Sequence, residues 1–440
     1  MSSKITLTII QGKLSGKQYS FESRSTCIIG RNHDCNLQLA NEIDMTISRY
    51  HCLLDINPPD IRVRDLGSLN GTFVNGRKIG QRKRNQTAQE GLKLNFPEYD
   101  LQDSDEIKLG DICFKIAIEA EKSEQILADQ PIVQAERQNH TTIINNLLEL
   151  AHNGDQNLKI ISSYKLVKSL GKGSIGEVFL AENNKQRKFV AIKLMSPAVT
   201  GKEQGINQFL AEAKNTKSLA HTNIVHLLDY GFALENFFFV MEYCEGGNVW
   251  DLMQRSGWRL PIDVAVDIII QVLEGLSYAH ELELSDITTN KGFVHRNLNP
   301  YNILITYSND QIIAKIGDYG LAKAFDLAGL SGQTLTGNQM GIPAFIPRQQ
   351  VLDFQNSLPE VDVWATAACL YNMLTGYFPR NFTGDPWLAV LQNDPVSILK
   401  RNQTVPKKLA EVIDTALVEK PKITFQTAAE FKQALINSMS

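Results

Sequence analysis

The first 118 residues consist of short apolar or alternating runs, and turn-forming residues interrupt them about every ten positions. Eight such runs are separated by Gly, Asn, Asp and Pro. Strands of this length and spacing are typical of a sandwich of two antiparallel sheets. We therefore expect residues 1–118 to form an all-β sandwich. Residues 81–100 break the pattern and are expected to be a surface loop. A solvated loop face is the preferred interpretation of its Arg82, Lys83 and Arg84, and a binding patch is the alternative.

Composition narrows the classes of protein to which the chain can belong. Its 440 residues predict two or three domains. A net charge of −4 leaves no basic excess to neutralise nucleic-acid phosphates, and no apolar run approaches the roughly 18 residues of a membrane helix. The six scattered cysteines lack a CxxC pair and are typical of reduced thiols. We expect a cytoplasmic protein with no nucleic-acid and no membrane partner.

The composition changes between residues 119 and 163. Glu, Gln, Lys and Asn dominate up to about His140, as in a linker. The next segment, TTIINNLLELAHNG, has apolar residues at helical spacing and a glycine stop, and predicts one short amphipathic helix. Packing on a neighbouring domain is the preferred interpretation, and binding of an external partner is the alternative, for its apolar residues Ile143, Ile144, Leu147, Leu148 and Leu150.

Beyond Tyr164 the pattern predicts a small sheet followed by a large helical region. Five β-like runs are interrupted by one helical stretch near residues 205–220, and a mostly helical region begins near Gly247. We expect a two-lobed α+β domain over residues 164–440. Its parts are an N-lobe (164–241), a hinge (242–246) and a C-lobe (247–440).

Three clusters between the first strands carry phosphate-binding chemistry: Gly30-Arg31, Ser48-Arg49-Tyr50-His51, and DLGSLNGTFVNG from Asp65 to Gly76. They offer a guanidinium, a hydroxyl and an amide, the groups that a phosphate dianion requires. In this order and spacing they resemble the forkhead-associated (FHA) domain, a β-sandwich that binds phosphothreonine.

The FHA resemblance implies a role for each of these residues. Arg31 and Ser48 hold the phosphate, Arg49 assists, and Asn70 bonds the backbone of the bound peptide. His51 is expected to be a packed structural histidine. The residue before Asn70 is commonly Thr or Ser in this family and is Leu69 here, so one contact with the peptide is expected to be missing.

A second ordered set of motifs occupies the remainder of the chain. A glycine-rich turn follows a strand-like run, and the later motifs come in this order: Gly171-Lys172-Gly173-Ser174-Ile175-Gly176-Glu177-Val178, Val190-Ala191-Ile192-Lys193, Glu212 in FLAEAK, the segment from His295 to Asn302, Asp318-Tyr319-Gly320, Gly341-Ile342-Pro343-Ala344-Phe345 and Asp362-Val363-Trp364. The set resembles the eukaryotic-type Ser/Thr protein kinase domain across residues 164–440.

The kinase resemblance implies where ATP and Mg²⁺ bind. The glycine-rich turn approaches the phosphates closely because glycine has no Cβ. Lys193 contacts the α- and β-phosphates and is oriented by Glu212, while Asn302 and Asp318 supply the oxygen ligands that Mg²⁺ prefers. Met241 is the gatekeeper, and the hinge contacts adenine. The nucleotide-binding residues that the resemblance implies are Gly171, Gly173, Gly176, Val178, Ala191, Lys193, Glu212, Met241, Glu242 and Cys244.

The catalytic loop departs from the family at two positions. Asn297 replaces the catalytic aspartate, and Asn299 replaces the lysine two positions further on; Arg296 precedes them. A carboxamide accepts a hydrogen bond but takes up no proton at neutral pH. General-base help is worth about 10²–10⁴-fold in rate, and loss of the lysine removes electrostatic stabilisation of the transferring phosphate. We therefore expect a catalytically dead or severely weakened domain, a pseudokinase.

A buried ion pair of the family is also expected to be missing. Arg348 stands where the family has a glutamate, and Thr424 stands where the family has the arginine that pairs with it. Loss of one partner alone would leave a buried charge unpaired, at a cost of roughly 3–5 kcal/mol. The paired loss predicts a lobe that folds without an active-type activation segment.

Two further segments are expected to lie at the surface. Thr334 and Thr336 lie where active members of the family are phosphorylated, but threonine is also common in surface loops. The stretch Glu281–Gly292, which precedes the catalytic loop, is expected to be a surface insertion.

Together these patterns predict a phosphothreonine-dependent signalling or scaffold protein whose kinase-like domain binds Mg-ATP. Its partners would be phosphothreonine-containing proteins, including an active kinase or another signalling protein. The alternative is an active, low-turnover Ser/Thr kinase acting on proteins that the FHA domain recruits. A third possibility, transfer of another group from ATP, has no residue that specifically supports it.

Overall fold

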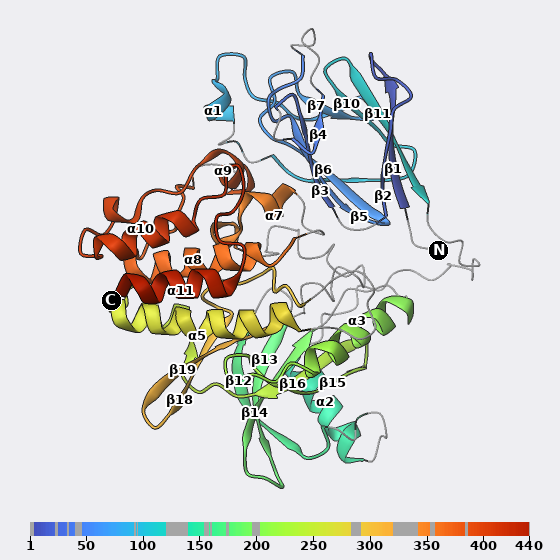
Figure 1. Cartoon of the computed structure of the whole chain (residues 1–440). Helices are drawn as coiled ribbons and strands as arrows, with labels where there is room; N and C mark the ends of the chain where they lie inside the picture. Colours follow the sequence, from blue (N-terminus) through green and yellow to red (C-terminus); the bar gives the residue numbers. More distant parts are fainter. Residues whose placement is uncertain are drawn as a thin grey trace. The chain divides into compact units, whose positions relative to one another are not determined.

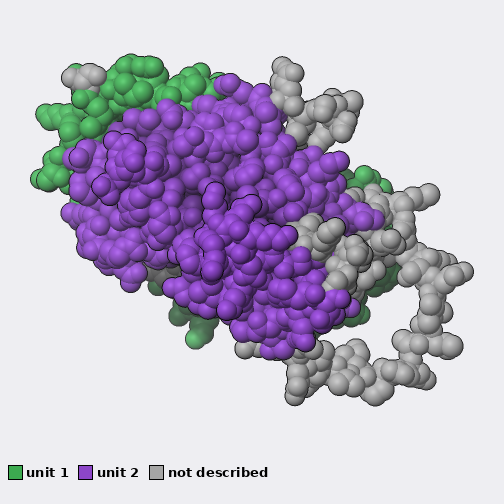
Figure 2. All heavy atoms as spheres, turned by 90° about the horizontal axis from the view of Figure 1, so that it is seen from below, with its two compact units in different colours: residues 1–122, 341–440 green, residues 123–340 purple. Residues whose placement is uncertain are grey.

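Figure 1 shows the computed structural model of the chain. The structure describes residues 4–22, 25–32, 35–39, 46–91, 94, 96–119, 140–153, 158, 161–172, 176–195, 203–282, 292–319, 342–352, 357–382 and 386–439. The chain divides into two compact units, residues 1–122 with 341–440 and residues 123–340, which Figure 2 shows in green and purple.

Two sheets form the N-terminal part of the first unit. One has the strand order β2-β1-β11-β10-β7-β8, made of β1 (Lys4–Gln11), β2 (Gln18–Phe21), β7 (Thr72–Val74), β8 (Arg77–Gly80), β10 (Glu106–Leu109) and β11 (Ile112–Glu119). The other has the order β4-β3-β5-β6-β9, made of β3 (Ser25–Gly30), β4 (Leu37–Gln38), β5 (Cys52–Asn57), β6 (Asp60–Asp65) and β9 (Tyr99–Leu101). All strand pairs are antiparallel except β3–β4.

The sandwich core follows from the two-residue period of its strands. Ile5, Leu7 and Ile9 of β1 are fully buried in one apolar cluster, together with Leu54 and Ile56 of β5 in the other sheet. Because inward side chains of both sheets enclose this core, the prediction of an all-β sandwich is confirmed.

The prediction for residues 81–100 was wrong in part. This stretch contains the short helix α1 (Ala88–Gly91) and the start of β9. Arg82 does not simply face solvent, because its Nη1 donates to the carbonyl of Gly67 at 2.6 Å. The strands β4, β8 and β9 were not predicted, because none of them forms a distinct apolar run in the sequence.

The second unit begins with a helix and a five-stranded sheet. The sheet order is β12-β13-β14-β16-β15, made of β12 (Tyr164–Lys172), β13 (Glu177–Asn183), β14 (Phe189–Met195), β15 (Leu227–Ala233) and β16 (Asn236–Glu242). The linker helix is α2 (His140–His152), and its Ile144 and Leu147 are buried in a cluster with this sheet. A second apolar cluster joins α3 (Glu203–Lys217) to the sheet. In it, Phe209 of α3 packs on Phe237 of β16 with ring centroids 4.0 Å apart.

The rest of the second unit surrounds a three-stranded sheet that was not predicted. Its strands are β17 (Gly247–Asn248), β18 (Ile303–Ser308) and β19 (Gln311–Ile316). The helices are α4 (Val249–Arg255) and α5 (Ile262–Glu281), and α5 contacts β19. The chain between β18 and the end of α5 carries the candidate catalytic loop.

The helical part of the first unit encloses one fully buried helix. Its elements are η3 (Pro343–Phe345), α7 (Arg348–Leu352), α8 (Glu360–Thr375), α9 (Pro386–Gln392), η4 (Ile398–Lys400), α10 (Lys407–Ala416) and α11 (Ala428–Met439). Every residue of α8 is buried, and α10 and α11 contact it. Across the described residues, no helix combines the length and the apolar character needed to cross a membrane.

Candidate functional site

The five-stranded sheet presents four of the predicted nucleotide-binding residues on one face. Val178 of β13 pairs with Lys193 of β14, and Ala191 pairs with Met241 of β16. Directly paired residues point to the same side of an antiparallel sheet, as do residues two apart in one strand. Val178, Ala191, Lys193 and Met241 therefore share a face.

The last glycine of the glycine-rich turn lies close to the backbone of β14. A Cβ at Gly176 would lie 2.1 Å from the carbonyl oxygen of Leu194, so only glycine permits this approach of β13 to β14. A Cβ at Gly171 would meet nothing within 4 Å. Gly173 lies outside the described residues.

Lys193 reaches across the unit to Asp318. Its Nζ lies 2.7 Å from Asp318 Oδ2, although the two residues are 125 positions apart in the sequence. Lys193 is buried, and Asp318 has a φ of 54°, in the left-handed region that few non-glycine residues adopt. Glu212, the predicted orienting residue, is buried on α3.

The hinge is tied to β19 through its acidic residue. Glu242 Oε1 lies 3.0 Å from Lys315 Nζ and accepts a hydrogen bond from the backbone N–H of His226 at 2.7 Å. Cys244 is buried, and burial raises the pKa of its thiol to about 12. Glu242 therefore ties the hinge to its neighbours, and the buried Cys244 thiol stays protonated at neutral pH.

A buried histidine holds the catalytic loop in place. His295 Nδ1 accepts from the backbone N–H of Asn297 at 3.2 Å, so its Nε2 carries the proton and donates to the carbonyl of Gly317 at 2.9 Å. This joins the catalytic loop to the residue before Asp318. Arg296 has a φ of 63°, and this left-handed residue turns the chain between the histidine and Asn297.

Asn299 has a structural role that the sequence did not indicate. Its Nδ2 donates to the carbonyl of Asn297 at 2.9 Å, and its Oδ1 accepts from the backbone N–H of Tyr301 at 3.0 Å. Its Nδ2 also lies 3.4 Å from Asn297 Oδ1. Asn299 is 4% exposed, so its amide closes the loop and does not project toward a substrate.

The predicted metal ligands lie next to this loop. Asn302 Nδ2 donates to the carbonyl of Asn297 at 2.8 Å, and the backbone N–H of Gly317 donates to the carbonyl of Asn302 at 2.8 Å. Asn302 is therefore joined to the segment that carries Asp318. Among the described residues no group of three or more His, Cys, Asp or Glu could hold a metal ion alone. A site made of Asn302 and Asp318 fits Mg²⁺, which is commonly bound by one or two protein oxygen ligands together with substrate phosphates.

In the sandwich, hydrogen bonds bring the three predicted phosphate-binding clusters together. The backbone N–H of Arg31 donates to the carbonyl of Ser48 at 3.1 Å, and the backbone N–H of Leu69 donates to Ser48 Oγ at 2.9 Å. Asn70 Nδ2 donates to the carbonyl of Thr46 at 2.7 Å. Because Ser48 Oγ accepts from Leu69, its own proton is available to a ligand oxygen.

The buried residues His51 and Asp65 hold these clusters together by hydrogen bonds. His51 is fully buried, and its ring bonds the backbone N–H of Ser48 at 3.2 Å and the carbonyl of Gly71 at 3.1 Å. Burial lowers the pKa of His51, so the neutral ring is favoured. The Asp65 carboxylate accepts from the hydroxyls of Ser68 and Thr72, each at 2.6 Å. Sequence reasoning missed Asp65, although its place at the start of the third cluster was visible.

The surface above these residues carries positive charge. Arg31 and Arg49 are exposed, and neither forms an ion pair with a described carboxylate. Arg49 also lowers the pKa of Arg82, after the larger effect of burial on that group. Two exposed guanidinium groups, together with the Ser48 hydroxyl, suit a phosphate dianion.

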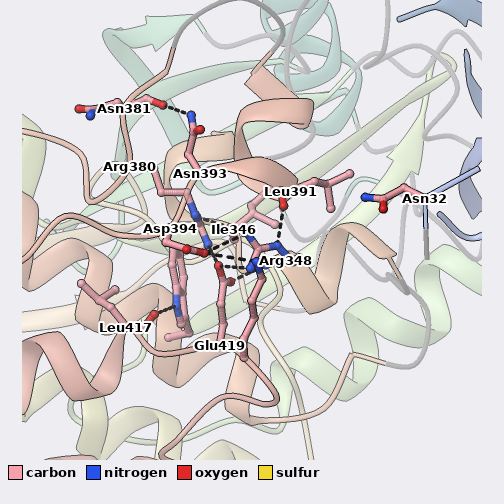
Figure 3. A network of polar contacts seen from close by, with 12 residues as sticks. Asn32, Ile346, Arg348, Arg380, Asn381, Leu391, Asn393, Asp394, Leu417 and Glu419 are labelled. Carbon is pink, nitrogen blue, oxygen red and sulfur yellow. Dashed lines mark hydrogen bonds and ion pairs between the residues drawn. The ribbon is translucent and has the colours of Figure 1, made fainter. Parts of the chain in front are cut away.

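Arg348 forms buried ion pairs that the sequence did not predict, although the family's own pair is absent at positions 348 and 424. Arg348 is 5% exposed, and its Nη1 lies 3.4 Å from Glu419 Oε1, while its backbone N–H donates to Glu419 Oε2 at 2.8 Å. Arg380 Nη2 lies 2.5 Å from the same Oε1. Figure 3 shows this arrangement, in which one carboxylate lies between two guanidinium groups. A different acid has replaced the family's pair, so the start of α7 is supported after all.

Two expected features cannot be placed in the fold. Thr334 and Thr336 lie outside the described residues, as does most of the stretch Glu281–Gly292.

Comparisons with known proteins assign both parts of the chain to families. The protein kinase domain model matches residues 164–431, and the FHA domain model matches residues 27–110. Because the first match covers more than half of the chain, the chain belongs to the protein kinase family. It carries an FHA domain followed by a protein kinase domain.

Named relatives are Ser/Thr kinases over this second domain. The probable serine/threonine-protein kinase CPE1738 of Clostridium perfringens is 29% identical over 269 residues, which are 61% of this chain and 37% of that protein. The serine/threonine-protein kinase PknA of Mycobacterium tuberculosis is 31% identical over 280 residues, 62% of this chain and 60% of that protein. The chain thus spans less than two thirds of the length of these relatives.

A solved structure matches this chain over nearly its whole length. Rad53 residues 1–466, solved in complex with AMP-PNP, matches with a TM-score of 0.50 and 21% identity, over 98% of this chain and 99% of that one. At this identity the match supports the fold alone. The FHA domain implies phosphothreonine-peptide binding, and the kinase fold implies binding of ATP and Mg²⁺.

Proposed function

We propose that this protein is a signalling kinase that binds phosphothreonine-containing partners through its FHA domain and slowly transfers the γ-phosphate of Mg-ATP to proteins recruited in this way. Kinship with Ser/Thr kinases supports the activity. The observation that carries the proposal is the Lys193–Asp318 pair at 2.7 Å beside a catalytic loop held in a single arrangement by hydrogen bonds.

The Lys193–Asp318 pair fits an ATP-Mg²⁺ site because each member has a partner in the nucleotide complex. The Lys193 ammonium suits phosphate oxygens, and the Asp318 carboxylate, together with Asn302, suits Mg²⁺. When bound, Mg²⁺ neutralises charge that develops on the phosphates. Val178, Ala191 and Met241 supply an apolar sheet face for the base.

Slow transfer follows from the amide at position 297. Asn297 accepts a hydrogen bond and orients a substrate hydroxyl, but the hydroxyl proton must leave to water or to the phosphate. Phosphoryl transfer has a loose transition state that depends mainly on positioning and charge. A rate of about 1–100 s⁻¹ for ordinary kinases, reduced by about 10²–10⁴-fold, gives roughly 10⁻⁴–1 s⁻¹.

A specific observation favours a second candidate, a pseudokinase scaffold. Asn299 is folded into the loop and contributes no positive charge to the site, so both Asn297 and Asn299 lack the charge that the family uses there. In this candidate Mg-ATP binds and stabilises the domain, but no phosphate is transferred. Transfer of labelled phosphate by the wild type, compared with Asp318→Ala, discriminates between the two.

Nucleotide binding is tested by thermal unfolding of the full chain with and without Mg-ATP. At 100 times the dissociation constant, ligand linkage stabilises the folded state by about 2.7 kcal/mol. The shift should shrink in Lys193→Met and in Asp318→Ala. Absence of any shift in a folded wild-type sample at millimolar Mg-ATP would contradict both candidates.

The FHA function is tested by fluorescence anisotropy with a degenerate phosphothreonine peptide library and its unphosphorylated counterpart. Arg31→Ala should abolish phosphate-dependent binding, because it removes a charge-assisted contact. The matched control is Arg77→Ala, an exposed arginine at the far end of the β7–β8 hairpin. Equal binding of the two libraries would overturn this part of the proposal.

A further inference from the structure

An apolar cluster covers the outer face of one sheet of the sandwich. Four buried residues come from the FHA domain, namely Ile28, Cys35, Leu53 and Leu66. Four come from the segment between residues 346 and 391 of the kinase domain, namely Ile346, Val351, Val390 and Leu391. Both sets belong to the first compact unit.

The strands of this sheet are apolar on both faces. In β3, Ile29 belongs to the sandwich core and its neighbour Ile28 to the outer cluster; in β5, Leu54 belongs to the core and Leu53 to the outer cluster. Antiparallel sheets normally have polar residues on the face away from the core. Ile28 is 0% exposed and Leu53 is 6% exposed, so a partner covers this face.

A polar contact fixes the register between this face and α7. Asn36 Nδ2 donates to the carbonyl of Leu352, the last residue of α7. Carbonyls in the last turn of a helix lack partners within the helix, so this bond satisfies one of them. Asn36 Oδ1 accepts from the backbone N–H of Ile28 at 2.9 Å, which orients the amide toward the helix.

The buried ion pairs described above organise the kinase side of this contact. Arg348 Nε donates to the carbonyl of Leu391 at 2.8 Å, and Arg380 Nη1 donates to the carbonyl of Ile346 at 3.2 Å. Arg348 therefore joins α7 to α9 directly, and Glu419 links it to Arg380. The apolar residues of both helices are thus held as one surface.

The same contact adjoins the phosphate-binding loops. Cys35 Sγ donates to the carbonyl of Arg49 at 3.3 Å, the backbone N–H of Asn32 donates to that carbonyl at 3.1 Å, and Asn32 Nδ2 donates to Tyr50 Oη at 2.6 Å. Tyr50 packs against the outer cluster. Residues that follow Arg31 and Arg49 in the sequence therefore bond to the interface or belong to it.

We propose that the outer face of the β3–β5 sheet is a docking surface for α7 and α9 of the same chain, and that docking strengthens phosphothreonine binding. Docking orders Cys35 and Tyr50, and these residues hold the backbone of Arg49 in its binding position. The binding loops of the docked chain therefore lose less conformational entropy when they bind a peptide. Coupling between binding events is reciprocal, so a bound phosphopeptide strengthens docking by the same factor. The coupling, unlike the docking, rests on the proposed function of the FHA domain.

Disulfide trapping in the full chain tests docking without any peptide. Asn36→Cys with Leu352→Cys should form an intramolecular cross-link under mild oxidation, at a yield that dilution does not change. The control pair, Ile10→Cys with Leu352→Cys, should not, because Ile10 lies on an exposed position of β1. Absence of the cross-link in a folded sample, or cross-linked dimers alone, would overturn docking within one chain.

Peptide affinity tests the coupling. Leu352→Asp should weaken binding of the phosphothreonine library by about 5-fold or more, the lower end of typical coupling between sites. Leu358→Asp, a change at an exposed leucine outside the cluster, should leave affinity unchanged. Equal affinities of wild type and Leu352→Asp would overturn the coupling. If neither protein binds the peptides, the proposed FHA function and the coupling fail together, while the cross-link still decides docking.

Discussion

Replacing Glu419 by glutamine should destabilise the first unit severely. The carboxylate lies between Arg348 and Arg380, which are 5% and 1% exposed. The variant would leave two buried guanidinium groups without their shared counter-ion. Removing one partner of a buried ion pair costs about 3–5 kcal/mol, because the remaining charge is desolvated and unpaired. Asp394 lies 3.4 Å from Arg348 but is mostly exposed, so it compensates little.

Thermal and urea unfolding, followed by circular dichroism, measure this loss. For a unit of this size, about 1 kcal/mol lowers Tm by roughly 2–4 °C, so a fall of about 6–20 °C is expected. Asp394→Asn is the matched control, and a change of about 1 kcal/mol or less is expected for this exposed partner.

A triple variant separates the charge effect from loss of contacts. Changing Glu419, Arg348 and Arg380 together to methionine removes every unpaired charge, and buried ion pairs replaced by apolar residues are often neutral in stability. We expect most of the lost stability to return. Destabilisation by Glu419→Gln of less than about 1 kcal/mol would refute the reasoning, since it would mean that solvent or another group already neutralises these charges.

Three further predictions concern the two sites. Burial lowers the pKa of His51 below its usual 6.5, so its neutral form contributes stability that is present above about pH 6.5 and is lost as the pH falls below that value. The urea concentration at the unfolding midpoint should therefore decrease when the pH is lowered from about 7.5 to about 5.5, and it should decrease less in His51→Gln. An increase of the midpoint over this pH range would contradict the prediction. Gly30→Ala should weaken phosphopeptide binding measured by anisotropy, because the new Cβ would lie 2.2 Å from the carbonyl of Arg49; unchanged affinity would show that the loop can shift freely. Asn297→Asp should raise the rate of phosphate transfer by about 10²-fold or more. Adding Asn299→Lys should not raise the rate further, because the lysine breaks the hydrogen bonds that close the loop. A double variant faster than the single one would refute that role for Asn299.

Local patterns predicted most of the fold. Eight strands of the sandwich, the five-stranded sheet and the linker helix α2 were visible because their apolar residues recur at the period of a strand or a helix. The strands β4 and β17 have two residues each and leave no such pattern. The helix α8 is buried on all sides, so it carries no single apolar stripe, and its bounds were not predicted.

Contacts between residues far apart in the sequence were not predictable in this way. Glu419 is 71 positions from Arg348, and nothing in either segment indicates that a new acid replaces the family's glutamate. The apolar outer face of β3 and β5 did carry a signal, since TCIIG and CLLDI do not alternate. Such a run indicates a strand covered on both faces, but it does not identify the covering helix.

Single-turnover transfer of labelled γ-phosphate tests the central claim most directly. Enzyme in excess of Mg-ATP is incubated with a basic protein substrate, and wild type, Asn297→Asp and Asp318→Ala are compared after identical purification. The account predicts slow transfer by the wild type, within roughly 10⁻⁴–1 s⁻¹, faster transfer by Asn297→Asp, and none above background by Asp318→Ala. A wild type indistinguishable from Asp318→Ala, in a sample that binds Mg-ATP, would contradict the claim of catalysis and leave the pseudokinase scaffold.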